Sequence, residues 1–340
     1  MSRYIFTTRG VGRRAMFFSL ASLLLAGCAS GAVALSAVGQ PSLSLTAPLS
    51  ALACTSSGTC ITLGASGAAS GPTTTAQVRN HKGVWSALNV PSALAASFDA
   101  ASCASSSCFF GGTQVSGDLL WTVNADNGAT RALAGPTAGL LILNLSCASN
   151  TNCTTIDQVA HGLIRISSTT NAGRNWSPPR TLPWAFDTTT VLDCVSTHDC
   201  YVASTSAHHH VSLHRSLNGG VTWSTVTTPA AWTSLSSLNC ATTCTALVTT
   251  AAGSTVARQS KLTWSSTPLK FAATSMSCAS ANVCLVVGHH SDQSAAMTEW
   301  RANGLSNVAL SYVPTALTNV ACEPGICVAV GVTTTVALRP

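Results

Sequence analysis

Short segments in which apolar and polar residues alternate recur along the chain, each beside a pair of cysteines. The segments LSSLNC (235–240) and LTNVAC (317–322) end at the first cysteine of a pair, and CLVVG (284–288) and CVAVG (327–331) begin at the second. Alternation with a period of two is typical of a half-buried β-strand. The pattern therefore predicts strand pairs in which the two cysteines bracket a hairpin turn.

The cysteine pairs form an internal repeat. Successive first cysteines lie 49, 44, 47, 46, 38 and 44 residues apart, and the pairs account for 14 of the 15 cysteines. A period of this length fits four short strands, in the order strand, hairpin turn, strand, strand, tight turn and strand. The seven pairs are Cys54/Cys60, Cys103/Cys108, Cys147/Cys153, Cys194/Cys200, Cys240/Cys244, Cys278/Cys284 and Cys322/Cys327.

Paired cysteines can bind zinc or form disulfides. Zinc sites favour gaps of two to four residues and need two pairs brought together. Most gaps here are longer, and the N-terminus described below indicates export to an oxidising compartment, where disulfides persist. We therefore predict one short-range disulfide per repeat and no metal bound by these cysteines.

A second turn recurs between the hairpins. It is clearest in TTNAGRNW (169–176) and SLNGGVTW (216–223). Asn171 and Asn218 can accept hydrogen bonds from amides of their own turn, and Gly173 and Gly220 can adopt a positive φ. Trp176 and Trp223 can pack between sheets.

These two turns resemble the Asp-box, S/T-x-D-x-G-x-x-W/F, of the sialidase-like (BNR) β-propeller superfamily, with asparagine in place of the aspartate. The chain also resembles exported actinobacterial lipoproteins built from cysteine-paired repeats. The resemblance implies an all-β fold, a seven-bladed β-propeller of four-stranded blades. The orphan strand before Pro48 is expected to complete the last blade, and an array of β-sandwiches is the alternative.

The N-terminus resembles a bacterial lipoprotein signal. Four arginines precede an apolar run over 15–25 and the tetrapeptide LAGC, which ends at Cys28. Such a run is too short for a permanent membrane-spanning helix, and either Tat or Sec export fits it. We predict a signal peptide over 1–27, lipidation of Cys28, a tether over 28–41 and the propeller over 42–340. Localisation is then the outer side of the cell membrane, or secretion without lipidation.

Charge and composition narrow the function. Charged residues make up 8% of the chain, and without the signal 12 basic residues face 10 acidic ones. The remaining Arg and Lys are scattered singly, so no nucleic-acid partner is expected. Contact with the membrane is expected only through the lipid anchor.

No catalytic constellation stands out. A sialidase-like site needs an arginine triad and a Tyr/Glu pair, whereas the chain has three tyrosines and two glutamates, and Glu323 lies in a hairpin turn. The aspartates are dispersed over the repeats, where most are expected to cap turns. We predict no catalytic residues and no cofactor, with a sialidase-like or other glycoside hydrolase as the alternative.

The sequence places ligand binding on the face opposite the disulfides. Its loops carry six histidines, which could bind a metal or form a pH-dependent patch. Aromatic residues in the connections between blades could stack on sugars, although packing between blades is their commoner role. The candidate residues are His161, His208, His209, His210, His289, His290, Trp184, Phe186 and Trp232, and Phe98 belongs to the same group.

Together these features predict a lipid-anchored propeller that acts as a non-catalytic recognition or assembly scaffold for a protein or glycan at the cell surface. A histidine-dependent metal-binding surface protein is a further alternative.

Overall fold

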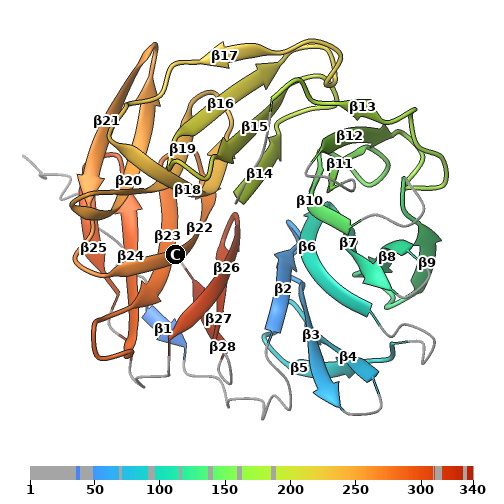
Figure 1. Cartoon of the computed structure of the whole chain (residues 1–340). Coiled ribbons are helices and arrows are strands. Elements are labelled where there is room, and N and C mark those ends of the chain that lie inside the picture. The colour runs from blue at the N-terminus through green and yellow to red at the C-terminus, as the bar shows by residue number, and fades with distance from the viewer. Residues whose placement is uncertain are drawn as a thin grey trace, which may run out of the picture. The chain divides into compact units, whose positions relative to one another are not determined.

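Seven antiparallel sheets of four strands each make up the fold (Figure 1). The computed structural model describes residues 36–38, 49–68, 71–90, 96–114, 117–136, 141–158, 163–184, 189–308, 310, 316–331 and 335–339. All of them belong to a unit formed by residues 34–340. The predicted signal over 1–27 and the lipidation site Cys28 lie outside the described residues.

Successive stretches of chain form the first six sheets, in strand order from the innermost to the outermost. The first sheet contains β2 (Leu49–Cys54), β3 (Cys60–Ala68), β4 (Gly71–Arg79) and β5 (Trp85–Leu88). The second contains β6 (Ala96–Ala104), β7 (Ser107–Gln114), β8 (Gly117–Asn124) and β9 (Thr130–Ala134). The third contains β10 (Leu141–Cys147), β11 (Cys153–Gln158), β12 (Ile164–Thr169) and β13 (Arg180–Thr181).

The next three sheets repeat this arrangement. The fourth contains β14 (Thr189–Cys194), β15 (Cys200–Thr205), β16 (Val211–Ser216) and β17 (Ser224–Val226). The fifth contains β18 (Trp232–Cys240), β19 (Cys244–Thr250), β20 (Gly253–Ser260) and β21 (Thr263–Pro268). The sixth contains β22 (Ala272–Ser280), β23 (Val283–His289), β24 (Ala295–Arg301) and β25 (Gly304–Asn307).

The seventh sheet joins the two ends of the chain. It contains β26 (Leu317–Glu323), β27 (Ile326–Gly331) and β28 (Thr335–Arg339), and β1 (Ser36–Val38) is its outermost strand. Ser36 pairs with Arg339 and Val38 with Ala337. An N-terminal strand thus completes the last sheet, as predicted, but this strand is Ser36–Val38 and not the segment directly before Pro48. It lies within the residues 28–41 assigned to a tether, so the folded unit begins before residue 42; residues 39–48 are outside the described ranges.

Apolar packing between neighbouring sheets closes the ring. Each of seven clusters of buried residues is shared by two successive sheets, and the last joins the seventh sheet to the first. In that last cluster Trp85 and Cys60 of the first sheet pack with Val328 of the seventh. The structure is therefore the predicted seven-bladed β-propeller, in which every blade buries both of its faces. Among the described residues no helix is long and apolar enough to cross a membrane.

All seven predicted disulfides are present. Each joins a cysteine at or near the end of an innermost strand to the directly opposed cysteine of the second strand, with Cα atoms 3.8–4.1 Å apart. These bonds and the turns between third and fourth strands lie at the same end of the blades, called here the disulfide end.

Three of the second strands begin earlier than the sequence predicted. We expected each to start at its second cysteine, but β7, β23 and β27 begin one residue before Cys108, Cys284 and Cys327. The reason is that strand pairing continues past the disulfide toward the turn, as between Ala104 and Ser107, and the sixth and seventh sheets do the same. Cys108, Cys284 and Cys327 therefore lie inside strands, only 0%, 0% and 3% exposed, in apolar clusters between blades. The disulfides and the hairpins that the cysteines bracket are confirmed, and only the first residue of these three strands differs from the prediction.

Candidate functional site in the central channel

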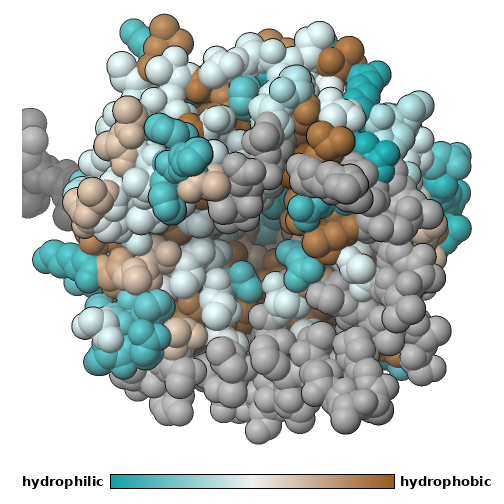
Figure 2. All heavy atoms as spheres, viewed as in Figure 1, coloured by the Kyte–Doolittle hydropathy of each residue, from teal (hydrophilic) through white to brown (hydrophobic). Residues whose placement is uncertain are grey.

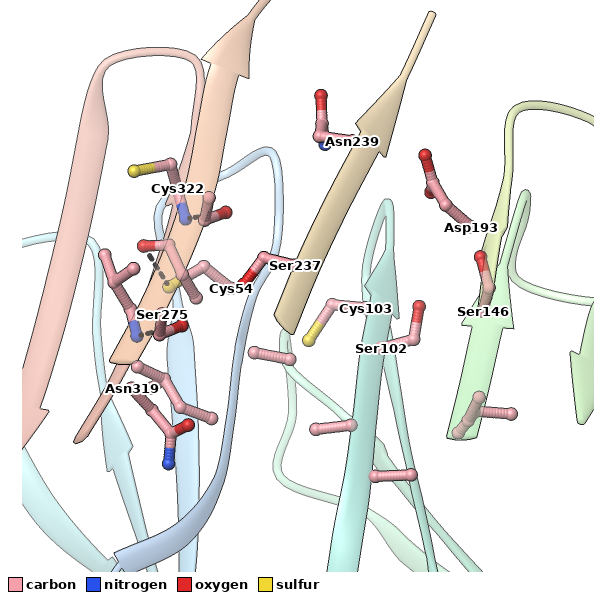
Figure 3. Close-up of a pocket in the computed structure, with 18 of the residues that line it drawn as sticks. Cys54, Ser102, Cys103, Ser146, Asp193, Ser237, Asn239, Ser275, Asn319 and Cys322 are labelled. Atoms are coloured by element: carbon pink, nitrogen blue, oxygen red, sulfur yellow. Dashed lines mark hydrogen bonds between the residues drawn. The ribbon is translucent and has the colours of Figure 1, made fainter. Parts of the chain in front are cut away.

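The innermost strands of all seven sheets line a channel with a volume of about 530 Å³ (Figure 3). Its lining extends to Glu323 and Pro324 at the hairpin turn of the seventh sheet, so the cavity reaches the disulfide end. The sequence had placed ligand binding at the opposite end of the blades. Hydroxyl and amide groups dominate the lining: Ser50, Ser102, Asn144, Ser146, Ser236, Ser237, Asn239, Ser275, Ser277 and Asn319.

A β-bulge recurs in six of the seven innermost strands. In each, one residue four positions before the first cysteine is left out of the pairing with the second strand. A bulge bends the strand and redirects its side chains. Where the bulged residue is Ser236, Thr274 or Thr318, its hydroxyl donates to a carbonyl of the second strand, at 3.4, 3.2 and 3.2 Å. The hydroxyl thus hydrogen-bonds to the second strand at the point where the bulge interrupts the backbone pairing of the two strands.

Side chains of one blade bind the free backbone edge of the next. The amides of Cys147, Cys194 and Cys322 each donate to a serine hydroxyl of the preceding blade at 2.9 Å. These acceptors are Ser102, Ser146 and Ser277, each directly before the first cysteine of its own blade. Innermost strands would otherwise present unpaired amides to the channel. The links therefore hold neighbouring blades together around the channel.

A second tier of links lies two residues earlier. The Met276 amide donates to Ser237 at 3.1 Å, and the Val320 amide to Ser275 at 3.3 Å. Some of these bonds are dashed in Figure 3. Cys54 Sγ also lies 3.8 Å from the Ala321 carbonyl oxygen, but it carries no proton because it is in a disulfide, so this is a contact only. Together with the Asp193 link described below, the two tiers join each blade from the second to the seventh to its neighbour along the channel wall.

Asp193 replaces serine at one position of the first tier. Its carboxylate accepts the Cys240 amide, as the serines do for their own neighbours. Burial raises the pKa of Asp193 from 3.8 to about 7, which the Cys240 amide partly opposes and the charge of Asp199 reinforces. Burial also raises the pKa of Glu323, from 4.5 to about 7. Two carboxyls of the channel thus titrate near neutral pH.

Asp193→Asn is expected to stabilise the protein most at pH 8 and clearly less at pH 5. The folded state holds the Asp193 proton to a higher pH than the unfolded chain does, so the free energy of unfolding falls as pH rises from about 4 to about 7. Asparagine keeps an oxygen that accepts the Cys240 amide, and because it does not titrate, it removes the fall in the free energy of unfolding with rising pH. Because Asp193 is only half-buried, we expect a gain of about 1 kcal/mol.

Urea unfolding at both pH values measures this difference. Asp126→Asn, at an exposed position in the β8–β9 turn, is the matched control. Equal stabilisation at pH 5 and pH 8 would contradict the assigned protonation of Asp193.

The sequence did not single out Asp193. It was one of several dispersed aspartates expected to cap turns. Asp292 does so, since its Oδ1 accepts from the Ser294 amide at 2.9 Å. Asp193 instead lies inside a strand that lines the channel. The available signal was a carboxyl at the position before a first cysteine, which carries only Ala, Ser or Asn in the other six repeats.

The turns at 169–176 and 216–223 have the predicted internal bonds. Asn171 Oδ1 accepts the Asn175 amide and Asn218 Oδ1 the Thr222 amide, both at 2.8 Å. Gly173 and Gly220 have φ values of 78° and 84°. Trp176 of the third blade and Trp223 of the fourth each pack in the apolar cluster shared with the preceding sheet. Both turns therefore pack the blades together.

The histidine candidates are not brought together. His208, His209 and His210 are exposed in the β15–β16 turn of the fourth sheet, whereas His289 and His290 lie at the β23–β24 turn of the sixth. His161 lies outside the described residues. Among the residues that the structure describes, no group of three or more His, Cys, Asp or Glu side chains could hold a metal ion.

The described aromatic candidates pack against other rings. Trp232 is 2% exposed and lies 4.8 Å from the Trp264 ring. Trp184 stacks on His214 with ring centres 3.8 Å apart. Phe98 is 1% exposed, and Phe186 is outside the described ranges. Packing between blades, the commoner role, accounts for these rings, so a Trp232 stacked on sugar is excluded by its burial.

The face of the molecule seen in Figure 2 is weakly polar where its residues are described. Figure 2 shows mostly pale and hydrophilic residues on the viewed face, with hydrophobic residues in small separate groups. The described residues thus form a propeller with a polar central cavity.

Comparison with known proteins shows the fold. The sequence matches no protein-family model and no curated protein. Among solved structures, YCF48 bound to D1 peptide has a TM-score of 0.63 at 11% identity, over 90% of this chain and 94% of that one. A chain of the mitotic checkpoint complex has a TM-score of 0.65 at 10% identity, over 97% and 99%. The GH74 xyloglucanase from Xanthomonas campestris has a TM-score of 0.63 at 11% identity, over 86% of this chain and 52% of the enzyme.

Proposed function

We propose that the protein is exported, is lipid-anchored at Cys28, and acts as a non-catalytic recognition or assembly scaffold for a protein or glycan at the cell surface. The resemblance of its turns to the Asp-box of sialidase-like propellers and the lipoprotein-like N-terminus support this. Two of the similar structures contain protein-bound propellers, since YCF48 was solved with D1 peptide and another chain belongs to the mitotic checkpoint complex.

The observation that carries the proposal is the chemistry of the channel. Its described lining contains Asp99, Asp193 and Glu323 as the only charged side chains and no Arg, Lys, His or Tyr. A sialidase-like site would need arginines for the substrate carboxylate and a Tyr nucleophile. Hydroxyls, amides and strand edges offer many hydrogen bonds, which suits recognition of a polar segment.

Photo-crosslinking tests this function. A photoreactive amino acid replaces Asn239 or Glu323 at the channel, or Ser266 on the exposed outer strand β21 as a control. In cells that make the protein, we expect a discrete crosslinked partner from both channel positions and none from Ser266. The same products from all three positions would contradict channel recognition.

Purified protein is also incubated with sialosides and xyloglucan fragments. Turnover that is lost in Asp193→Asn would favour a glycoside hydrolase and overturn the non-catalytic proposal.

A further inference from the structure

A second cavity lies between the fourth and fifth blades at the disulfide end. It is a groove of about 340 Å³, away from the central channel. Tyr201 and Arg215 of the fourth blade lie on one side, and Thr243, Gln259 and Lys261 of the fifth blade on the other. Residues 224–227 of the fourth blade, Thr242 and Leu262 complete the lining.

The groove is open because the fifth blade has a shorter turn at this position. In the third and fourth blades the corresponding turns are long, and their buried Gly173 and Gly220 lie against Leu120 and Ile166 of the preceding blade. In the fifth blade β20 and β21 are joined by two residues, Lys261 and Leu262, because Ser260 already pairs with Thr263. Both turn residues are exposed, so the space between blades is not filled.

One cation of the groove is fixed in place. Arg215 donates from Nε and Nη2 to the two carboxylate oxygens of Asp199, at 2.8 and 2.7 Å. Its guanidinium also lies 5.1 Å from the centre of the Tyr201 ring. A guanidinium has five N–H donors, so this pairing leaves others for a ligand. Arg215 is thus held in position before any ligand binds.

The charge of the groove favours an anion. Arg215 and Lys261 are its charged lining residues, and no carboxylate belongs to the lining. Asp199 neutralises one of the two cations, so Lys261 supplies the unpaired positive charge. Burial raises the pKa of Tyr201, which therefore stays a neutral hydroxyl. A single carboxylate on the ligand would match this lining.

The remaining lining favours a ligand rich in hydroxyls. Thr243 Oγ1 is buried without a hydrogen-bond partner among the described residues. Thr225 and Thr227 are exposed at the groove, and Gln259 adds an amide. An unpartnered buried hydroxyl costs free energy that a ligand group can recover. The cavity is also at the small end of the usual range for ligand sites, about 300–1,000 Å³.

We propose that this groove binds an acidic sugar unit, a hexuronate of an anionic polysaccharide, with its carboxylate at Lys261 and Arg215 and its hydroxyls at Thr243 and Gln259. This deepens the proposed recognition function and rests on it for the extracellular location. The groove and the channel are separate, so either can bind when the other does not.

Titration calorimetry with the folded protein tests the site. The probes are trigalacturonate, a neutral galactose trisaccharide, an acetylated triglutamate peptide and acetate. We expect trigalacturonate to bind and the other three to bind at least about tenfold more weakly. Lys261→Met should weaken trigalacturonate binding about tenfold, the loss expected for one charge-assisted hydrogen bond. Lys270→Met removes the same charge at an exposed position outside the groove lining and should leave binding unchanged.

Thr225→Trp provides a second variant, because a large side chain at this exposed position should fill the groove and abolish binding without disturbing the core. Absence of trigalacturonate binding, or binding unaffected by Lys261→Met and Thr225→Trp, overturns the proposal. Tighter binding of the triglutamate peptide also overturns it, in favour of an acidic-peptide site. If the channel positions give no crosslinked partner while trigalacturonate still binds the groove, channel recognition is refuted and the groove proposal stands.

Discussion

Reduction of the disulfides is expected to unfold the protein under conditions in which the oxidised protein stays folded. Each bond closes a loop with a sequence separation of four to six residues. Loop entropy then gives about 2 kcal/mol per bond, and on the order of 15 kcal/mol for all seven. The net stability of a folded protein is about 5–15 kcal/mol, so the loss is comparable to the whole.

Circular dichroism during heating measures the effect. The melting temperature should fall by about 30 °C or more after reduction and alkylation. Alkylation without reduction is the control and should modify none of the fourteen paired cysteines. An unchanged melting temperature after complete reduction would show that interblade packing and hydrogen bonds suffice. The double variant Cys240→Ser/Cys244→Ser should lose only about 2 kcal/mol.

Gly288→Ala is expected to destabilise the protein by about 3 kcal/mol, the upper part of the usual range for overpacking. A Cβ at Gly288 would lie 2.0 Å from the Ala272 carbonyl oxygen and 2.8 Å from the Ala273 Cα. Both atoms belong to the backbone of β22, beside its bulge, so no side-chain rotation can relieve the clash. The strands of the sixth blade must separate instead.

Urea unfolding of Gly288→Ala should therefore show a clearly lower midpoint. Ser204→Ala is the matched control, because Ser204 occupies the same position in the fourth blade, already has a Cβ, and lies opposite a strand without a bulge in its described part. A midpoint for Gly288→Ala equal to that of Ser204→Ala would contradict the close approach of the two strands.

The repeat, the disulfides and the four-stranded blades could be predicted from sequence because each depends on local residue patterns. Cysteine spacing and period-two alternation locate the hairpins, and Asn, Gly and Trp in the long turns specify their geometry. The bulges were missed, although glycine stands four residues after the second cysteine in four repeats, at Gly64, Gly112, Gly288 and Gly331. Each of these glycines pairs with the residue directly before a bulge.

The candidate sites were harder to predict because they depend on contacts between blades. The raised pKa of Asp193 follows from its burial in the channel wall, and its partner Cys240 lies 47 residues away in the next repeat. The groove at Lys261 exists because the turn between β20 and β21 is shorter than the corresponding turns of the third and fourth blades. A shorter turn contains no sequence motif by which the groove could have been predicted. Histidine runs were conspicuous in the sequence but lie on separate sheets.

The pairing of β1 with β28 also has a consequence for biosynthesis. The first described residues, Ser36–Val38, have no partner until Ala337–Arg339 have been made. During synthesis or export the seventh blade therefore stays incomplete while the six preceding blades can already form. Contacts between residues this distant in sequence form slowly, and an incomplete blade exposes strand edges that can aggregate. A variant that lacks residues 337–339 would leave Ser36–Val38 without their pairing partners, so its seventh blade could not be completed.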